Sequence, residues 1–480
     1  MQKLLQDETE KLMQELGLTE EDLASLDRVT FPKLFLLDRR RIATVSPTAS
    51  LDKMAPIAIA RLKALVTPEW LKSEAKKKYR LTKDFLSSPF QLVGSIRIDN
   101  TADPPAQRLA RMILLCEDWI KDAEDLDFHA ASLLVPEAIM LGMSIDKIPK
   151  LGPEAVRKLG RLSMMRDDDH VAAAVHELLV GTACVSMGTD VEMIKSNSTE
   201  KSPDFRVLGK GPPTVIECKR RIGLSDYEQK EAMSIGRLYD SVREELRSRR
   251  HSISLEVEFD VEVRCVRVTD FRRAALKCAK TIPWKDGFQK ETWGKIKCVG
   301  LPYYTDLRKT RLYAPIFMEK VFQWHSELSE WDGIIAEVDS PSQFIVSNAK
   351  QPICLKWRCR NDIAILKKSR GVTSLWAKAV KQIPPGEMGI IYISYPEQNA
   401  PEIADERTLS IFKSMKEWRH DWWVSVPLVI IGRLYPRPRG VGNPDLIENA
   451  IVLVETDLED VLPDKYPGPV FVPAPRYEDE

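Results

Sequence analysis

The amino-acid sequence predicts an α/β protein built from more than one domain. Its 480 residues are too many for one ordinary hydrophobic core. Its composition, with 44% hydrophobic and 30% charged residues, is that of a globular chain and not of a disordered one. A helical pattern fills the first third, and helices then alternate with short strands. We expect a mixed sheet core, a helical N-terminal domain and a C-terminal α/β region.

The first 160 residues are expected to form the helical N-terminal domain. Apolar residues recur at three- and four-residue spacing over Met54–Val66 and Gln107–Ala123, and the opening sixteen residues are also amphipathic. Turn residues at Asp103–Pro105 separate these segments. No residue of this part suggests chemistry, so we expect a scaffold or an interaction domain.

A second domain is expected over residues 161–270, in the order helix, three strands, helix, strand. An alanine-rich helix, His170–Met187, ends before Gly188. A long helix begins at Ser225, which forms an S-x-x-E capping box with Glu228. The strand Ile253–Val263 follows, and its alternating pattern predicts one wet face. The three strands between the two helices are Val191–Lys195, Asp204–Leu208 and Thr214–Lys219.

Residues 271–480 mix both kinds of element and could extend the preceding sheet. The expected helices are Ser374–Ile383 and Thr408–Trp422. The expected strands are Ile353–Cys359, Gly389–Tyr395, Pro427–Gly432 and Ala450–Glu455.

The charge balance and the cysteines of the sequence exclude some classes of protein. Lysine plus arginine number 71, as do aspartate plus glutamate, so nucleic acid would have to be bound through local patches and not by bulk charge. The eight cysteines form no C-x-x-C pair, which is typical of reduced cysteines in a cytosolic protein. The N-terminus lacks the apolar core of a signal peptide, and no apolar run is long enough to span a membrane. We therefore expect a cytoplasmic protein with no membrane partner.

One short stretch, Ser202–Arg221, carries the chemistry. In its second strand, period-two alternation places Glu217 and Lys219 on one face. If the loop 209–212 closes the hairpin without a bulge, Asp204 lies directly opposite Glu217. Opposed Cβ atoms are about 4.5–5.5 Å apart, so both carboxylates could bind one hard cation. Mg²⁺ suits such a site because it takes few carboxylates and keeps its waters.

Two further residues complete the expected catalytic set. Lys219 could orient the attacking water or stabilise the charge that develops on the phosphate. Glu177 stands in an otherwise apolar helix, VAAAVHELLVG, where an unpaired carboxylate would be costly to bury. A metal, a metal-bound water or Lys219 would relieve that cost. The neighbouring His176 is expected to be a packing residue.

At these residues the sequence resembles the PD-(D/E)XK nuclease superfamily. Pro203-Asp204 matches the first half-motif, Glu217-Cys218-Lys219 matches the second, and Glu177 matches the acidic residue of the first core helix. The resemblance covers residues 165–265. It implies a restriction-endonuclease-like fold, dependence on Mg²⁺ or Mn²⁺, and phosphodiester hydrolysis. The expected metal ligands are Asp204, Glu217 and Glu177.

The expected contacts with nucleic acid come from two groups of basic residues. Arg220, Arg221 and Lys230 follow the motif, and Arg358 and Arg360 share one face of a later strand. Trp357 stands between those two arginines and could stack on a base. The alternative for each group is an ordinary solvated surface. A further row of four acidic residues is expected to be the wet face of its strand: Glu256, Glu258, Asp260 and Glu262.

The leading hypothesis is a metal-dependent nuclease, with DNA preferred over RNA and endonucleolytic cleavage preferred over exonucleolytic. Defence or DNA processing would suit a regulated cutter of this kind. A homodimer, or a regulatory protein partner, would suit the large flanking regions. The alternative is an inactive nuclease-fold protein that binds nucleic acid or protein, and a third possibility is a helical assembly protein.

Overall fold

The structure is a computed structural model of the whole chain. The description that follows covers residues 41–45, 51–77, 90–92, 106–121, 128–195, 202–209, 211–249, 252–280, 287–301, 310–311, 320–323, 331–339, 345–346, 350–397, 401–417, 426, 428–438 and 444–454. The predicted opening helix lies outside these residues.

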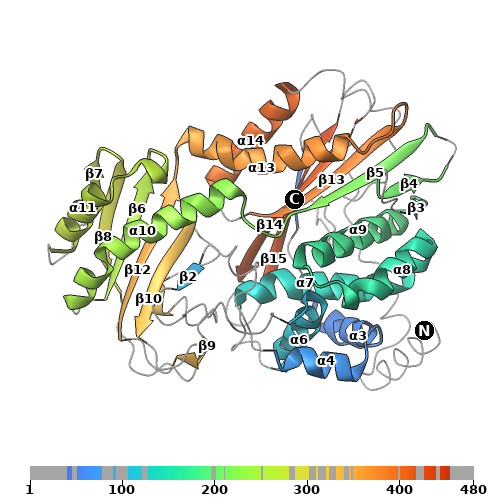
Figure 1. The fold of residues 1–480 in the computed structure, drawn as a ribbon, viewed down its shortest axis with the longest axis horizontal. Helices are drawn as coiled ribbons and strands as arrows, with labels where there is room; N and C mark the ends of the chain where they lie inside the picture. The colour runs from blue at the N-terminus through green and yellow to red at the C-terminus, as the bar shows by residue number, and fades with distance from the viewer. Residues whose placement is uncertain are drawn as a thin grey trace, which may run out of the picture.

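The described chain forms an α/β structure with two mixed sheets (Figure 1). The seven-stranded sheet has the order β1-β15-β14-β13-β5-β4-β3, and the six-stranded sheet has the order β2-β10-β12-β6-β8-β7. The first comprises β1 (Arg41–Val45), β3 (Val191–Met193), β4 (Phe205–Val207), β5 (Thr214–Arg220), β13 (Met388–Pro396), β14 (Leu428–Pro438) and β15 (Pro444–Val454). The second comprises β2 (Phe90–Leu92), β6 (Ile253–Phe259), β7 (Gln289–Glu291), β8 (Gly294–Gly300), β10 (Gly333–Asp339) and β12 (Lys350–Cys359). A separate pair joins β9 (Thr310–Arg311) to β11 (Ile345–Val346).

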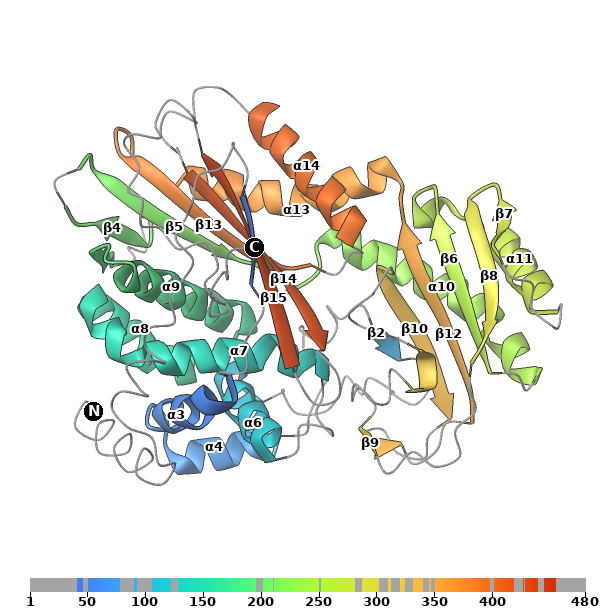
Figure 2. The ribbon, with the colours of Figure 1, turned by 180° about the vertical axis from the view of Figure 1, so that it is seen from behind.

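Helices cover both faces of the seven-stranded sheet (Figure 2). On β13, Ile390 and Tyr392 pack into the core under the first set of helices, while Ile391 and Ile393 pack under the second. A strand buried on both faces is apolar at almost every position, as β13 is. The first set is α3 (Leu51–Lys63), α4 (Pro68–Ala75), α6 (Arg108–Lys121), α7 (Phe128–Ser144), η1 (Ile145–Leu151), α8 (Pro153–Arg161), η2 (Leu162–Met164) and α9 (Asp168–Ser186). The second is α13 (Asp362–Val380) and α14 (Pro401–Glu417).

Two helices cover one face of the six-stranded sheet. They are α10 (Asp226–Ser248) and α11 (Val268–Lys280), and the short helix η3 (Val263–Cys265) precedes α11. The apolar residues of β6 and β12 alternate, and those that face these helices form the second core. The intervening residues of both strands, which are mostly charged, therefore point to the opposite face of the sheet.

The chain exchanges strands between the two sheets. After β5 it runs through α10 into β6, which pairs in parallel with β12. After β12 it runs through α13 into β13, which pairs in parallel with β5. Helix α10 therefore leads from a strand of the seven-stranded sheet to a strand of the six-stranded sheet, and α13 leads back. Each of the two sheets receives a parallel strand through one of these helices.

Several predicted elements are confirmed, some with different ends. The three strands after α9 are β3, β4 and β5, and the strands predicted in the last third are β12, β13, β14 and β15. The long helix begins after Ser225 with the predicted capping box, in which Ser225 and Glu228 exchange hydrogen bonds. The helix predicted from Ser374 begins earlier, at Asp362, because Asn361 caps it by accepting the N–H of Ala364.

The position of the strand after α10 corrects the sequence analysis. This strand, β6, was expected beside the three motif strands, but it lies in the six-stranded sheet, and β13 takes the place beside β5. It was also expected to have a wet face, yet all seven of its residues are buried. The reason is that β6 has a neighbour on each side, and the cations of β8 and β12 pair with its carboxylates.

The first part of the chain is mostly helical, as expected, and it also supplies an edge strand to each sheet. The predicted segments Met54–Val66 and Gln107–Ala123 are α3 and α6. The strand β1 pairs antiparallel with β15, and β2 pairs in parallel with β10. Helices α3, α6 and α7 share the core of the seven-stranded sheet, so they are packed against it and are not a detached unit.

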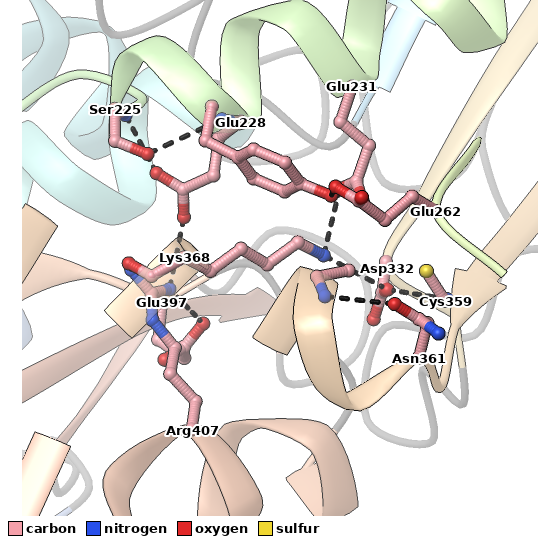
Figure 3. Close-up of polar contacts among 12 residues, drawn as sticks. Ser225, Glu228, Glu231, Glu262, Asp332, Cys359, Asn361, Lys368, Glu397 and Arg407 are labelled. Carbon is pink, nitrogen blue, oxygen red and sulfur yellow. Dashed lines mark hydrogen bonds and ion pairs between the residues drawn. The ribbon is translucent and has the colours of Figure 1, made fainter. Parts of the chain in front are cut away.

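Buried ion pairs join the two sheets through α10, α13 and α14 (Figure 3). The Lys368 ammonium lies 2.8 Å from Glu231 Oε2 and 3.6 Å from Asp332 Oδ2. The Arg407 guanidinium lies 3.0 Å from Glu228 Oε1. All of these side chains are at most 9% exposed. A buried charge that lost its partner would be costly, so these pairs fix how the helices sit between the sheets.

No helix among the described residues is long and apolar enough to cross a membrane.

Candidate functional site

The hairpin of β4 and β5 has the register that the sequence predicts. Phe205 pairs with Ile216 and Arg206 pairs with Val215, so the numbers of paired residues sum to 421. The same register places Asp204, which immediately precedes β4, opposite Glu217. Gly181 on α9 allows the helix to approach this hairpin, because a Cβ there would lie only 2.7 Å from the Phe205 ring.

Two contacts with the backbone of β5 hold Asp204 in place. Its N–H donates to the carbonyl of Ile216 at 3.0 Å, and its Oδ2 accepts the N–H of Cys218 at 2.8 Å. Burial raises the pKa of Asp204, while the charge of Lys158 and the Cys218 N–H act in the opposite direction. The carboxylate is therefore fixed against β5, directly beside the side chain of Glu217.

Glu217 is the most deeply buried acidic residue of the site, with no exposed surface. Burial and the neighbouring charge of Asp204 raise its pKa to about 9, although Lys219 opposes this. Its Oε2 is buried and has no hydrogen-bond partner among the described residues. Two carboxyl groups that face each other cannot both be charged at low cost. The charges of Lys219 and Lys158 offset part of this cost, but the pKa of Glu217 stays raised.

Lys219 points into the same site as the two carboxyl groups. Its ammonium forms an ion pair with Glu217 and donates to Gln382 Oε1 at 2.7 Å. Gln382 lies just beyond α13 and donates in turn to the carbonyl of Ser202 at 3.1 Å. An ammonium has three N–H donors, so one donor stays available for a water or a phosphate oxygen. Gln382 thus fixes both Lys219 and the loop that leads to Asp204.

Glu177 does not join the carboxyl pair, contrary to expectation. It is carried by α9, which packs on the face of the sheet opposite to Glu217, and it forms an ion pair with Lys158 of α8. That pair relieves the cost of burying Glu177, which the sequence analysis assigned to a metal or to Lys219. Within the described ranges, no group of three or more histidine, cysteine, aspartate or glutamate side chains is placed to hold a metal ion. Of the three predicted metal ligands, the two that lie together are therefore Asp204 and Glu217.

Lys158 is the residue of this site that sequence reasoning missed. Besides its ion pair with Glu177, its charge is the one that most strongly lowers the pKa of Asp204. It lies in the sequence EAVRKLGR, where lysine and arginine are ordinary surface residues of an amphipathic helix. No spacing rule connects it to the motif, because the contact is made only when α8 packs beside α9.

His176 is a packing residue, as expected. It is 1% exposed, and burial together with the charge of Arg220 lowers its pKa to about 3. A histidine with this pKa is neutral at physiological pH. It therefore cannot supply a proton to a leaving group in this pH range.

The basic residues that follow the motif differ in what they contact. Arg220 donates to Ser394 Oγ at 2.7 Å, and Arg221 lies 3.4 Å from Glu228 Oε2 and over the ring of Tyr395. Both are half-buried and tie β5 to its neighbours. Lys230 is exposed on α10. Of the three predicted phosphate contacts, Lys230 alone lies open on the surface.

The later basic pair lies on the second sheet and is not beside the motif. Arg358 forms a 2.5 Å ion pair with Glu258, and Arg360 lies 3.8 Å from the same carboxylate. Trp357 is 5% exposed within the core under α10 and α11, so it cannot stack on a base as expected. Arg358 lies on the face of β12 opposite to that core, and Arg360, just beyond the end of the strand, reaches the same carboxylate, so the two arginines lie on one side of the sheet as predicted.

Comparison with protein-family models, with curated proteins and with solved structures finds no match to this chain.

Proposed function

We propose that this chain is a divalent-metal-dependent nuclease, with Asp204, Glu217 and Lys219 as its catalytic residues. The observation that carries the proposal is the convergence of a carboxyl pair and a lysine on one hairpin. A structural role alone does not account for two opposed buried carboxyl groups, because each makes the other more costly to ionise. Asp204 and Glu217 would hold a metal ion, whose charge would remove that cost.

The fold proposed for this site is restriction-endonuclease-like. The helix α9, the antiparallel strands β3, β4 and β5, the helix α13 and the parallel strand β13 follow the α-β-β-β-α-β order that the motif implies. The difference is that α10 and the second sheet are inserted between β5 and α13. This insertion explains why the fourth core strand is distant in sequence from the motif.

The residues present fit a hard divalent cation such as Mg²⁺ or Mn²⁺. Glu217 Oε2 has no hydrogen-bond partner in the described part of the chain, and Asp204 is held beside it by Cys218. Two carboxylates are enough for Mg²⁺, which completes its coordination with waters and substrate phosphate. Bound there, the ion would polarise the phosphate and lower the pKa of the attacking water. Glu177 is not among the proposed ligands, because Lys158 holds it.

The protein's own groups supply positioning and charge. Glu217 and Gln382 hold the Lys219 ammonium, and its remaining N–H is directed to a water or to the phosphate oxygen that gains charge in the transition state. Gln382 also holds the Ser202 carbonyl, so it keeps the lysine and the loop before Asp204 in one arrangement. The positions of both carboxylates are fixed before substrate arrives, which lowers the cost of reaching the transition state.

Plasmid DNA and a folded RNA, each incubated with the purified chain in Mg²⁺, Mn²⁺, Ca²⁺ or EDTA, test this proposal. We expect nicking or linearisation of the plasmid in Mg²⁺ and Mn²⁺, which identifies an endonuclease. We expect little turnover in Ca²⁺, whose looser coordination positions water poorly. RNA cleavage without DNA cleavage would change the proposed substrate. Cleavage that persists in EDTA would exclude the proposed mechanism.

An inactive nuclease-fold protein that binds nucleic acid is the second candidate function. The paired charges on the second sheet favour it, since they form a surface away from the carboxyl pair. A chain that binds DNA in all four buffers and cuts in none would support this alternative.

A further inference from the structure

The hairpin of β10 and β12 in the second sheet repeats the hydrogen bonds of the candidate active site. Asp332, immediately before β10, donates its N–H to the carbonyl of Trp357 at 2.7 Å. Its Oδ2 accepts the N–H of Cys359 at 2.9 Å. In the β4–β5 hairpin, Asp204 makes the same two contacts at 3.0 and 2.8 Å, to two residues that are likewise separated by one position.

This shared scheme defines which residues occupy equivalent places. Gly333 pairs with Trp357, so the register of the second hairpin places Asp332 opposite Arg358. Arg358 therefore stands where Glu217 stands in the first hairpin. Arg360, two residues further on the same face, stands where Lys219 stands. The second strand of each hairpin also has a parallel neighbour on its other side: β5 pairs with β13, and β12 pairs with β6.

The replacement of Glu217 by an arginine changes what the second hairpin can bind. Without a second carboxylate, Asp332 cannot share a cation with its partner strand, and it lies 3.6 Å from the Lys368 ammonium instead. The guanidinium of Arg358 occupies the place of a metal ligand. This hairpin therefore keeps the scaffold of the candidate active site without the means to hold a metal ion.

Around this position cations gather on the sheet. On β6, Glu258 is paired with Lys295, Arg358 and Arg360, and Glu256 is paired with Lys297 and Lys356. Five cations of the described residues therefore form a row along two carboxylates of one strand. The more exposed cations are Arg360, Lys295 and Lys297, at 43, 36 and 30% side-chain exposure. Aromatic rings support the row: Trp331 lies 5.4 Å from the Arg358 guanidinium, and Phe288 lies 4.9 Å from both lysines.

We propose that this row of cations on the second sheet, centred on Arg358 and Arg360, binds the phosphate backbone of DNA without metal and without cleaving it. The geometry suits that ligand, because guanidinium groups in a row present paired N–H donors to successive phosphate oxygens. The inference rests on the proposed function for the identity of the ligand. It adds that the second hairpin is a non-catalytic counterpart that holds the nucleic acid cleaved at the first.

Binding in EDTA tests the proposal separately from cleavage. The probe is a fluorescent DNA duplex of about 30 base pairs, long enough for several phosphate contacts, and its anisotropy is followed at a series of salt concentrations. For Arg358→Gln with Arg360→Gln we expect binding about tenfold weaker or more. We also expect the slope of log affinity against log salt to fall by about two, since each lost phosphate contact lowers it by about one.

The matched control removes two arginines from the opposite face of the same sheet. Arg272 and Arg273 on α11 are exposed and ion-paired, and Arg272→Gln with Arg273→Gln lowers the net charge equally. We expect this variant to bind nearly as well as the wild type. Arg358 is only 13% exposed, so its replacement could also disturb folding. Arg360 is 43% exposed, and we expect Arg360→Gln alone to fold normally and to lose less affinity than the double variant.

Three results would overturn the inference: no binding by the wild type in EDTA, equal losses in the two double variants, or Arg360→Gln binding that matches the wild type. Failure of the nuclease proposal would give a different result. The wild type would then still bind the duplex in EDTA but would not cleave DNA in Mg²⁺.

Discussion

The Oδ2 atom of Asp204 accepts a 2.8 Å hydrogen bond from the backbone N–H of Cys218. Cys218 lies between Glu217 and Lys219, so this one contact ties the first half of the motif to the second. A carboxylate held by the backbone loses little freedom when it binds a ligand, and the position of Asp204 therefore does not depend on an ion being present.

Replacing one member of the carboxyl pair is expected to stabilise the metal-free protein. Glu217→Gln removes a buried carboxyl group whose pKa burial and the charge of Asp204 raise to about 9, and with it the cost of keeping that group in the folded protein. Lys219 loses this ion pair but keeps its hydrogen bond to Gln382. We expect the free energy of unfolding in EDTA to rise by about 1 kcal/mol or more, measured by urea denaturation. Glu177→Gln is the control, because Glu177 is paired with Lys158 and its loss leaves that lysine without a partner. A decrease in stability for Glu217→Gln equal to that of the control would contradict the interpretation of the pair.

Lys158 is expected to compete with the metal ion for the acidic residues. Its ammonium pairs with Glu177 and its charge acts on Asp204, so Lys158→Met removes a positive charge from the edge of the site. We expect Mn²⁺ to bind about tenfold more tightly, which corresponds to about 1.4 kcal/mol, as followed by electron paramagnetic resonance of free Mn²⁺. Arg157→Met is the control, because Arg157 is the adjacent residue of α8 and pairs with Glu154 instead. Equal Mn²⁺ affinity in the two variants would show that Lys158 does not act on the site.

The buried ion pairs between the sheets are expected to be sensitive to the loss of one partner. Lys368→Met leaves Glu231 and Asp332 buried beside each other without their cation. We expect a loss of about 3–5 kcal/mol in the free energy of unfolding. Arg273→Met, which breaks an exposed pair with Asp270, is expected to cost less than about 0.5 kcal/mol. Chemical denaturation of both variants measures the difference, and equal losses would contradict the role given to Lys368.

The same junction is expected to make the protein sensitive to acid. Burial alone would raise the pKa of Glu228, but the charges of Arg407 and Arg221 and the hydrogen bonds with Ser225 lower it to about 2. A carboxylate whose pKa is lower in the folded state contributes stability above its unfolded value, near 4.5, and loses it as the pH falls towards 2. We expect Glu228→Gln to be less stable than the wild type at pH 7 and to lose less stability between pH 4.5 and 2.5. A parallel pH profile of the two proteins would refute this assignment.

Local patterns predicted much of the candidate site. The alternation in β5 placed Glu217 and Lys219 on one face, and the loop length fixed the register that puts Asp204 opposite Glu217. The capping box located the start of α10. Strand alternation, hairpin register and helix capping each depend on residues that are close in the sequence, so they can be predicted from the sequence alone.

The parts that were not predicted depend on contacts between distant segments. The strand β6 has the same local pattern whichever sheet it joins, and its actual partner β12 lies about a hundred residues away. The polar pattern of Glu256 and Glu258 was interpreted as a solvated face, because the pairing cations come from β8 and β12. The position of Lys158 beside the motif arises in the same way, from helix packing that no spacing in the sequence indicates.

The central claim is that Asp204 and Lys219 act in cleavage and not in holding the nucleic acid, and one paired assay tests it most directly. Cleavage of plasmid DNA in Mg²⁺ and binding of a duplex in EDTA are measured on the wild type, Asp204→Ala and Lys219→Ala. We expect both variants to lose cleavage by about 10²–10⁴-fold, as for other electrostatic and acid–base contributors, and to bind the duplex as the wild type does. Wild-type cleavage by Asp204→Ala would show that the site is assigned wrongly.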